Sequence, residues 1–280
     1  MIFWFRFFSH WPLWALHAVG QLVGWLAWLL SPTYRRRFLA NVKTAGLSGW
    51  QVMGAVGQAG CMSTELPRLW LGKQPKVVWA DGALPLVQEA YEAKQGVLFL
   101  TPHLGCFEIS AQALADAFSA KQGPLTVLYR PSRQAGLAQV MEASRARPGL
   151  ETAPTTLAGV RQMIKALRAG RSVGLLPDQV PPEGMGQWVP FFGKPAYTMT
   201  LAARLTLQTG AKLVLIWGER LPWGLGYRVH ASALQENLAS DVDGLVLQIN
   251  QAMERLILTR PEQYLWGYAR YKQPRQESQA

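Results

Sequence analysis

Residues 96–108, with the sequence GVLFLTPHLGCFE, decide the fold of this chain. Their unbroken apolar run, Val97–Leu100, is typical of a strand that is buried on both faces, as in a parallel sheet. Pro102 and Gly105 then predict a turn, with a helix beginning at about Cys106. A strand, a turn and a helix in succession indicate an α/β fold, a mixed, largely parallel central sheet flanked by helices.

His103 and Glu108 lie on either side of the predicted turn. Five residues along a continuous helix would place two side chains roughly 140° apart, so these two meet only if the backbone bends between them. Glu108 then falls in the first helical turn, where a negative charge suits the helix dipole. A histidine oriented by a carboxylate is a general base. A surface histidine beside a capping glutamate has the same pattern, so the pair alone leaves both interpretations open.

Two further apolar runs, at 125–129 and 172–176, predict strands that end at Arg130 and Asp178. Ligands of open α/β sheets bind at the carboxyl ends of the strands, so both residues are expected at the same edge as His103. Arg130 there could pair with a phosphate or stabilise an oxyanion, or it could be a solvated loop residue. Asp178 could hold Arg130, help to bind the acceptor, or only cap a turn.

The remaining segments predict the rest of the sheet and its covering helices. A loop at 181–194 is rich in proline and glycine, and its aromatic side chains, which include Phe192, could line an acyl groove, dip into lipid or pack beneath the loop. Helical patterns are expected at 36–71, 84–94, 156–169, 198–208 and 241–258, and strands at 77–81, 212–217 and 227–231, the last two as a hairpin.

Length and composition bound the class of protein. A chain of 280 residues can bury a full core, which favours one catalytic domain plus an appendage. The net charge of +11 and the pI of 10.0 imply an anionic partner, either nucleic acid, a membrane surface or an acidic protein. Cys61 and Cys106 form neither a disulfide framework nor a zinc spacing, which suits a reducing compartment.

The amino terminus favours the membrane. Residues 12–30 are long enough to cross a hydrocarbon core of roughly 30 Å, and tryptophans gather toward the two ends of the segment. Three arginines, 35–37, follow the apolar run, which argues against a signal peptide and predicts that the next domain stays in the cytoplasm. His10, His17 and Gln21 weaken a span, so a helix lying in the interface is the alternative. We expect an anchor at 1–34, a catalytic domain at 35–272 and a disordered tail at 273–280.

The segment HLGCFE, 103–108, resembles the His-x4-Glu motif of the lipid A late acyltransferases, the lauroyl and myristoyl transferases within the glycerolipid acyltransferase superfamily. Four further blocks follow in the order of that family: VLYRPSRQ (127–134), VGLLPDQ (173–179), PFFGKPAYT (190–198) and YLWGYARYK (264–272). With the amino terminus, the resemblance covers nearly the whole chain. The family commonly has Asn-Trp in place of Cys106-Phe107 and an asparagine in place of Gln134, which bears on substrate preference more than on the reaction.

The resemblance implies an acyltransferase without metal or cofactor, acting by direct general-base transfer. His103 would be the base, and Glu108 would hold its tautomer. The donor would be an acyl chain on acyl carrier protein, and the acceptor a hydroxyacyl group of a phosphorylated lipid A precursor. The implied substrate-binding residues are Arg130, Asp178, Gln179, Phe192, Gly193 and Arg270.

The expected location is the cytoplasmic face of the inner membrane, where a basic chain would attract both acidic substrates. Other acceptors, namely another glycolipid, a phospholipid or an aminolipid, stay open. So do a thiol hydrolase using Cys106 and a membrane-anchored lipid-binding protein without turnover. Nucleic-acid binding is not expected, since the arginines belong to no recognised module.

Overall fold

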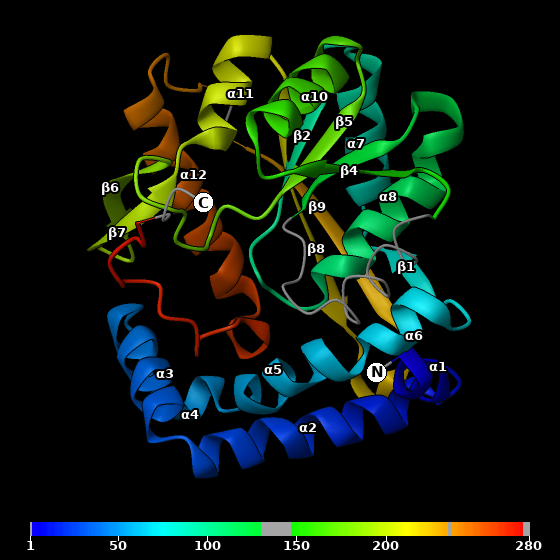
Figure 1. Cartoon of the computed structure of the whole chain (residues 1–280), viewed down its shortest axis with the longest axis vertical. Coiled ribbons are helices and arrows are strands. Elements are labelled where there is room, and N and C mark those ends of the chain that lie inside the picture. The colour runs from blue at the N-terminus through cyan, green and yellow to red at the C-terminus, as the bar shows by residue number, and fades with distance from the viewer. Residues whose placement is uncertain (1, 130–146, 235–236, 277–280) are drawn as a thin grey trace.

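The computed structural model describes residues 2–129, 147–234 and 237–276. Within them a central sheet has the strand order β1-β9-β8-β2-β5-β3-β4, with helices on both faces (Figure 1). Neighbouring strands are parallel except β8 and β9, which form the expected hairpin. The mixed, largely parallel sheet is therefore confirmed. The strands are β1 Val77–Trp79, β2 Val97–Leu100, β3 Leu125–Tyr129, β4 Leu150–Pro154, β5 Ser172–Leu175, β8 Lys212–Arg220 and β9 Tyr227–Ala233.

Strand β2 lies in the middle of the sheet, between β8 and β5, and all four of its residues are buried. Because successive side chains of a strand point to opposite faces, Leu98 and Leu100 belong to one core cluster, and Val97 and Phe99 to another. Helices α7 (Ala83–Glu92) and α8 (Phe107–Gln122) cover the Phe99 face. Helices α10 (Leu157–Arg168), α11 (Leu201–Thr209) and α12 (Val242–Thr259) cover the Leu100 face.

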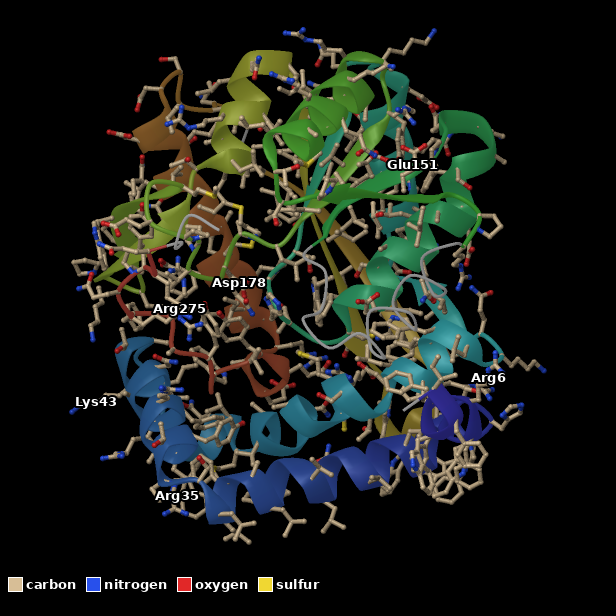
Figure 2. The ribbon with its side chains drawn as sticks, viewed as in Figure 1. Arg6, Arg35, Lys43, Glu151, Asp178 and Arg275 are labelled. Carbon is tan, nitrogen blue, oxygen red and sulfur yellow. The ribbon has the colours of Figure 1, made fainter. Side chains whose placement is uncertain are left out.

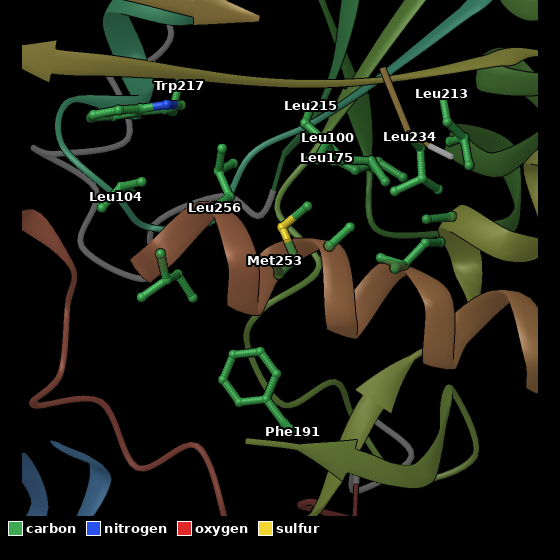
Figure 3. Packing of buried hydrophobic residues seen from close by; sticks show 14 of the residues in the cluster. Leu100, Leu104, Leu175, Phe191, Leu213, Leu215, Trp217, Leu234, Met253 and Leu256 are labelled. Carbon is green, nitrogen blue, oxygen red and sulfur yellow. The ribbon is translucent and has the colours of Figure 1, made fainter. Parts of the chain in front are cut away.

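The packing of α12 shows how this face is closed. Met253 and Leu256 of α12 point toward Leu100 and neighbouring leucines of β5 and β8 (Figure 3). This places the carboxyl end of β2, and the turn that follows it, over a rigid core.

Two segments differ from the sequence expectation. The expected loop at 181–194 contains strand β6 (Gly186–Phe191), which pairs antiparallel with β7 (Lys194–Met199) as a separate ribbon. Asn250 of α12 donates a hydrogen bond to the Pro190 carbonyl at 2.9 Å and holds the ribbon to the helix layer. Strand β4 at the sheet edge had no counterpart among the expected elements.

The amino-terminal helices are α1 (Ile2–Ser9), α2 (Leu13–Leu30), α3 (Pro32–Thr44), α4 (Gly49–Val52), α5 (Gly54–Thr64) and α6 (Leu66–Leu71). Helix α2 forms one edge of the molecule and lies alongside α5 (Figure 1). Among the helices that the structure describes, α2 is the one whose length and composition would suffice to cross a membrane. At the other end of the chain, the Arg275 carbonyl accepts a hydrogen bond from the Glu183 N–H, and 277–280 lie outside the described residues.

Candidate active site

The turns after two adjacent parallel strands bring His103 and Asp178 together. Leu100 of β2 pairs with Leu175 of β5, so the chain leaves both strands at the same level of the sheet. His103 Nδ1 lies 2.8 Å from Asp178 Oδ1, and the backbone N–H of His103 donates to Oδ2 of the same carboxylate at 2.9 Å. Asp178 lies near the middle of the molecule (Figure 2). One carboxylate thus fixes both the ring and the backbone of the histidine.

The second ring nitrogen of His103 faces Gln179. The Gln179 side-chain nitrogen lies 3.0 Å from His103 Nε2. A carboxylate accepts from Nδ1–H, and an amide N–H then donates to a bare Nε2, so the two contacts together assign the proton to Nδ1. The Phe107 ring packs against the imidazole, with centroids 5.1 Å apart. The free lone pair of this histidine is therefore on Nε2, as a general base requires.

Asp178 is almost fully buried, which makes its charge depend on its partners. Burial alone would raise its pKa, but electrostatic attraction to His103, two hydrogen bonds from that residue and the nearby charge of Arg270 lower the pKa below the ordinary value. The Tyr264 hydroxyl lies 3.3 Å from Oδ2 and adds a further donor. Asp178 is thus held as a carboxylate.

Glu108 takes another position from the one expected. Both ring nitrogens of His103 contact other side chains, so the carboxylate that orients the imidazole is Asp178 and not Glu108. Glu108 lies half-buried in the first turn of α8, where its Oε2 accepts a hydrogen bond from Trp70 Nε1 at 3.4 Å. The spacing His-x4-Glu gives a shared bend rather than a direct hydrogen bond.

Close backbone packing determines that bend. Gly105 has φ +57°, and a Cβ on it would collide with the Gly218 carbonyl of β8. The Gly105 N–H donates to the Gln263 carbonyl at 3.0 Å, and the Cys106 N–H donates to the Gly218 carbonyl at 2.7 Å. The turn between His103 and α8 is therefore tied to both β8 and the carboxyl-terminal segment.

Glu108 borders an apolar cavity of about 130 Å³ between α8 and the sheet. Its walls come from β2, β3, β4, β5 and β8 on one side and α8 on the other, and Trp70 of α6 lies at the same end as Glu108. An engineered cavity of about 150 Å³ holds a benzene molecule, so this one has room for several methylene groups. Residues that line it include Phe99, Phe107, Ala111, Leu114, Leu125, Leu150, Gly174 and Ile216.

Three predicted substrate-binding residues lie in or near the β6–β7 ribbon. Arg270 is buried, and its guanidinium donates to the Tyr197 carbonyl at 2.8 Å and to Thr198 Oγ1 at 2.6 Å. Phe192 and Gly193 form the ribbon's turn, both with positive φ, and Gly193 is exposed. These contacts hold Arg270 inside the protein, and its charge is close enough to lower the pKa of Asp178. Arg130 lies outside the described residues.

The structure also locates Cys106, the candidate nucleophile. Its side chain is 1% exposed and packs with Leu13, Ile109 and Tyr227, away from His103. Burial raises the pKa of the thiol well above its ordinary range, with the charge of Glu65 adding to the effect. A thiol in this environment stays protonated and unreactive.

Sequence reasoning missed two contacts in the candidate site. Tyr264, whose hydroxyl contacts Asp178, lies in the block YLWGYARYK, but nothing in that block distinguishes one tyrosine from the others. Trp70, which donates a hydrogen bond to Glu108, lies on a helix in which no functional residue was expected. Both contacts join residues far apart in the chain, so only the fold could reveal them.

Comparison with known proteins shows the family of this chain. Residues 79–273 match the family model described as bacterial lipid A biosynthesis acyltransferase. The chain is 24% identical over 198 residues to a lipid A biosynthesis palmitoleoyltransferase of Escherichia coli (strain K12), covering 69% of this chain and 62% of that protein. It is 26% identical over 188 residues to a lipid A biosynthesis lauroyltransferase of the same organism, covering 66% and 59%.

The chain therefore spans about six tenths of the length of these relatives. The family match covers residues 79–273, which include β2, the turn with His103, Asp178, the cavity walls from the sheet and the carboxyl-terminal segment. With the motif blocks in order and the site assembled at one edge of the sheet, the chain belongs to the bacterial lipid A biosynthesis acyltransferase family.

Proposed function

We propose that this protein transfers an acyl chain from acyl carrier protein to a hydroxyacyl group of a lipid A precursor, by direct general-base catalysis. The observation that carries the proposal is the His103–Asp178 pair beside an apolar cavity, in a chain of this family. The names of the two Escherichia coli relatives support the class of acceptor.

In the proposed reaction, His103 Nε2 takes the proton of the acceptor hydroxyl as its oxygen attacks the thioester carbonyl. Asp178 keeps the Nδ1 proton in place and stabilises the imidazolium that forms. The tetrahedral intermediate then expels the carrier thiolate, which receives the proton from His103. Gln179 lies where the acceptor hydroxyl would bind, so its amide is displaced by the hydroxyl or turns to hold it.

The proposed role of Glu108 differs from the one that the His-x4-Glu spacing suggested. It lies at the border of the cavity, in the same bend as His103, where a negative charge favours the imidazolium. Its hydrogen bond with Trp70 fixes the cavity wall at that point. The donor's acyl chain would enter the apolar cavity, with the thioester at the Glu108 end.

Donors for the oxyanion must come from groups that are not already occupied. The N–H groups of Gly105 and Cys106 are bonded to backbone carbonyls. The next N–H group in the chain, that of Phe107, lies in the first turn of α8, at the positive end of the helix dipole. We assign the Phe107 N–H to the oxyanion, with Arg130 as a further candidate.

The proposed location is the cytoplasmic face of the inner membrane. The apolar helix α2 and the arginines that follow it support this location, as does the need to meet a lipid acceptor.

Transfer of a radiolabelled acyl group from acyl carrier protein to purified lipid A precursor tests the proposal, with mass spectrometry of the product. The wild type should form one ester, and His103→Ala should reduce the rate by about 10³-fold or more. His230→Gln is the matched control, because His230 contacts Glu219 outside the site. Equal background signals from the wild type and His103→Ala would indicate a lipid-binding protein without turnover.

A further inference from the structure

Helix α2 packs along α5 through glycine-lined contacts. Gly20 and Gly24 of α2 face Gly57 and Gly60 of α5 so closely that a Cβ on any of them would collide with the opposite helix. Small residues that let two helices approach backbone to backbone give an extended and specific contact. Helix α2 is therefore fixed to the catalytic domain along much of its length.

The polar residues of α2 face the protein. His17 Nε2 lies 3.2 Å from Glu65 Oε2, and the Gln21 amide lies 3.7 Å from Cys61 Sγ. Glu65 is in turn held by Arg220 and Tyr227 of the central sheet. His17 and Gln21, two of the side chains that argue against a span in the sequence, thus have partners in the folded domain. A helix that crossed a bilayer would have to leave them.

The opposite face of α2 is apolar and exposed. It carries Trp14, Leu22, Leu26, Leu29 and Leu30, and it continues onto α1. Side chains of α2 project outward from this edge of the molecule (Figure 2). A patch of this kind marks a protein or membrane contact rather than ordinary surface.

A distant segment adds to the same surface. The short helix η1 (Pro222–Gly224), between β8 and β9, lies against the start of α2, because a Cβ on Gly224 would collide with the backbone of Trp14. Trp223 is 88% exposed although its φ is +57°, and Leu225 is 64% exposed. A tryptophan held outward in a strained conformation is a feature of functional sites.

The charge around this surface suits anionic lipid. Before Glu65 the sequence contains no acidic residue. Arg6 and Arg35 lie toward the two ends of α2 (Figure 2), and Arg35 donates to the carbonyls of Trp28 and Leu29 at the carboxyl end of the helix. Cations beside an apolar face with tryptophans are typical of helices that lie in the plane of the interface.

We propose that α1, the apolar face of α2 and the segment 223–225 form one membrane-docking surface, on which α2 lies parallel to an anionic bilayer instead of crossing it. This choice of partner rests on the membrane location proposed above, but not on acyl transfer. The surface adjoins the site, because Phe5 of α1 stacks on Trp70, with ring centroids 5.9 Å apart, and Trp70 borders the cavity. An acceptor lipid in the same leaflet would therefore lie beside the cavity.

Depth measurements test the proposal. Leu22→Cys, at the middle of α2, and Leu225→Cys would each carry a fluorophore in the full-length protein, on vesicles of phosphatidylethanolamine and phosphatidylglycerol with brominated acyl chains. A docked surface lies about 5–10 Å into the headgroup boundary, whereas the middle of a spanning helix lies roughly 15 Å deep. Bromines near the headgroup should quench both positions more strongly than bromines near the bilayer centre.

The matched control is Leu157→Cys, an exposed leucine on α10, far from α2 along the molecule (Figure 1), which should not be quenched. Cys61 and Cys106 are buried, so wild-type protein gives the labelling background. Stronger quenching of Leu22→Cys by central bromines would show a spanning helix and overturn the proposal. Absence of quenching at Leu225→Cys would remove the 223–225 segment from the surface and overturn the proposal as stated. Neither result would bear on the acyl-transfer assay.

Discussion

His103 and Asp178 are joined twice, by the ring Nδ1 at 2.8 Å and by the backbone N–H at 2.9 Å. The carboxylate is buried, and the pKa of Asp178 lies below its ordinary value because electrostatic attraction and hydrogen bonds from His103, with the charge of Arg270, outweigh the effect of burial. A histidine whose ring and backbone are both hydrogen-bonded to one carboxylate has one ring orientation and one tautomer. This arrangement makes Asp178, rather than Glu108, the residue whose removal most directly disturbs the imidazole of His103.

Asp178→Asn is the sharpest test of that pair. An amide of the same shape can donate to Nδ1, which would reverse the tautomer and place a proton on Nε2. In serine proteases the equivalent change lowers kcat by about 10⁴-fold, and we expect a loss of about 10³–10⁴-fold here. The measurement is the acyl-transfer rate with a thermal melt on the same protein. A folded Asp178→Asn that keeps a tenth of the activity would show that the pair is structural.

The sequence predicted the edge of the sheet on which the site lies, but not the pairing. Apolar runs located the strands that precede His103 and Asp178, and the rule for parallel strands placed both residues together. Which carboxylate reaches the imidazole depends on how the turn after Leu100 is held by Gly218 and Gln263. Those contacts are long-range, so proximity in sequence favoured the wrong partner, Glu108.

There is also a physical reason why the sequence did not predict strands β4, β6 and β7. Strand β4 ends with Pro154 at the sheet edge, and β6 and β7 pair Pro190 with Pro195, residues that interrupt strand patterns. Their pairing is maintained by contacts such as Asn250 with the Pro190 carbonyl. Tertiary packing determines the secondary structure of these segments, whereas the buried strands and long helices could be predicted from the local sequence pattern.

Filling the apolar cavity should change the preferred acyl chain length. Ala111 of α8 lines the cavity, and Ala111→Leu would occupy the space of a few methylene groups. Each methylene that no longer fits costs about 1–3 kcal/mol of transition-state binding, so kcat/KM for the longest accepted donor should fall at least tenfold. The measurement is competition among acyl carrier proteins loaded with different chains. Ala117→Leu, exposed on the same helix, is the control and should leave the preference unchanged.

Removing the thiol of Cys106 should leave transfer largely intact. The side chain is buried, and its pKa is raised by burial, so no thiolate is available for attack. We expect Cys106→Ala to retain at least about half of the activity and to lose about 1 kcal/mol of stability from the smaller side chain. Activity and a thermal melt should be measured together. Complete loss of transfer in a folded Cys106→Ala would point to an acyl-enzyme instead.

The buried pair of Glu65 and Arg220 should make the fold acid-sensitive. Burial alone would raise the pKa of Glu65, but the charge of Arg220 and hydrogen bonds from His17 and Arg220 lower it from 4.5 to about 2. Because the folded-state pKa is the lower one, the carboxylate stabilises the fold fully above pH 4.5, and this contribution is lost as the pH falls toward 2. A shift of this size corresponds to up to about 3 kcal/mol.

That contribution can be separated from general acid effects with the double variant Glu65→Gln/Arg220→Met, which removes both charges and leaves an acceptor for the Tyr227 hydroxyl. Replacing a buried ion pair as a whole is far less costly than removing one partner, so the variant should fold. The free energy of unfolding in urea, measured between pH 5 and pH 2, should fall more steeply for the wild type than for the variant. Parallel curves would mean that Glu65 is not a stabilising carboxylate, and the attachment of α2 through His17 and Glu65 would then rest on packing alone.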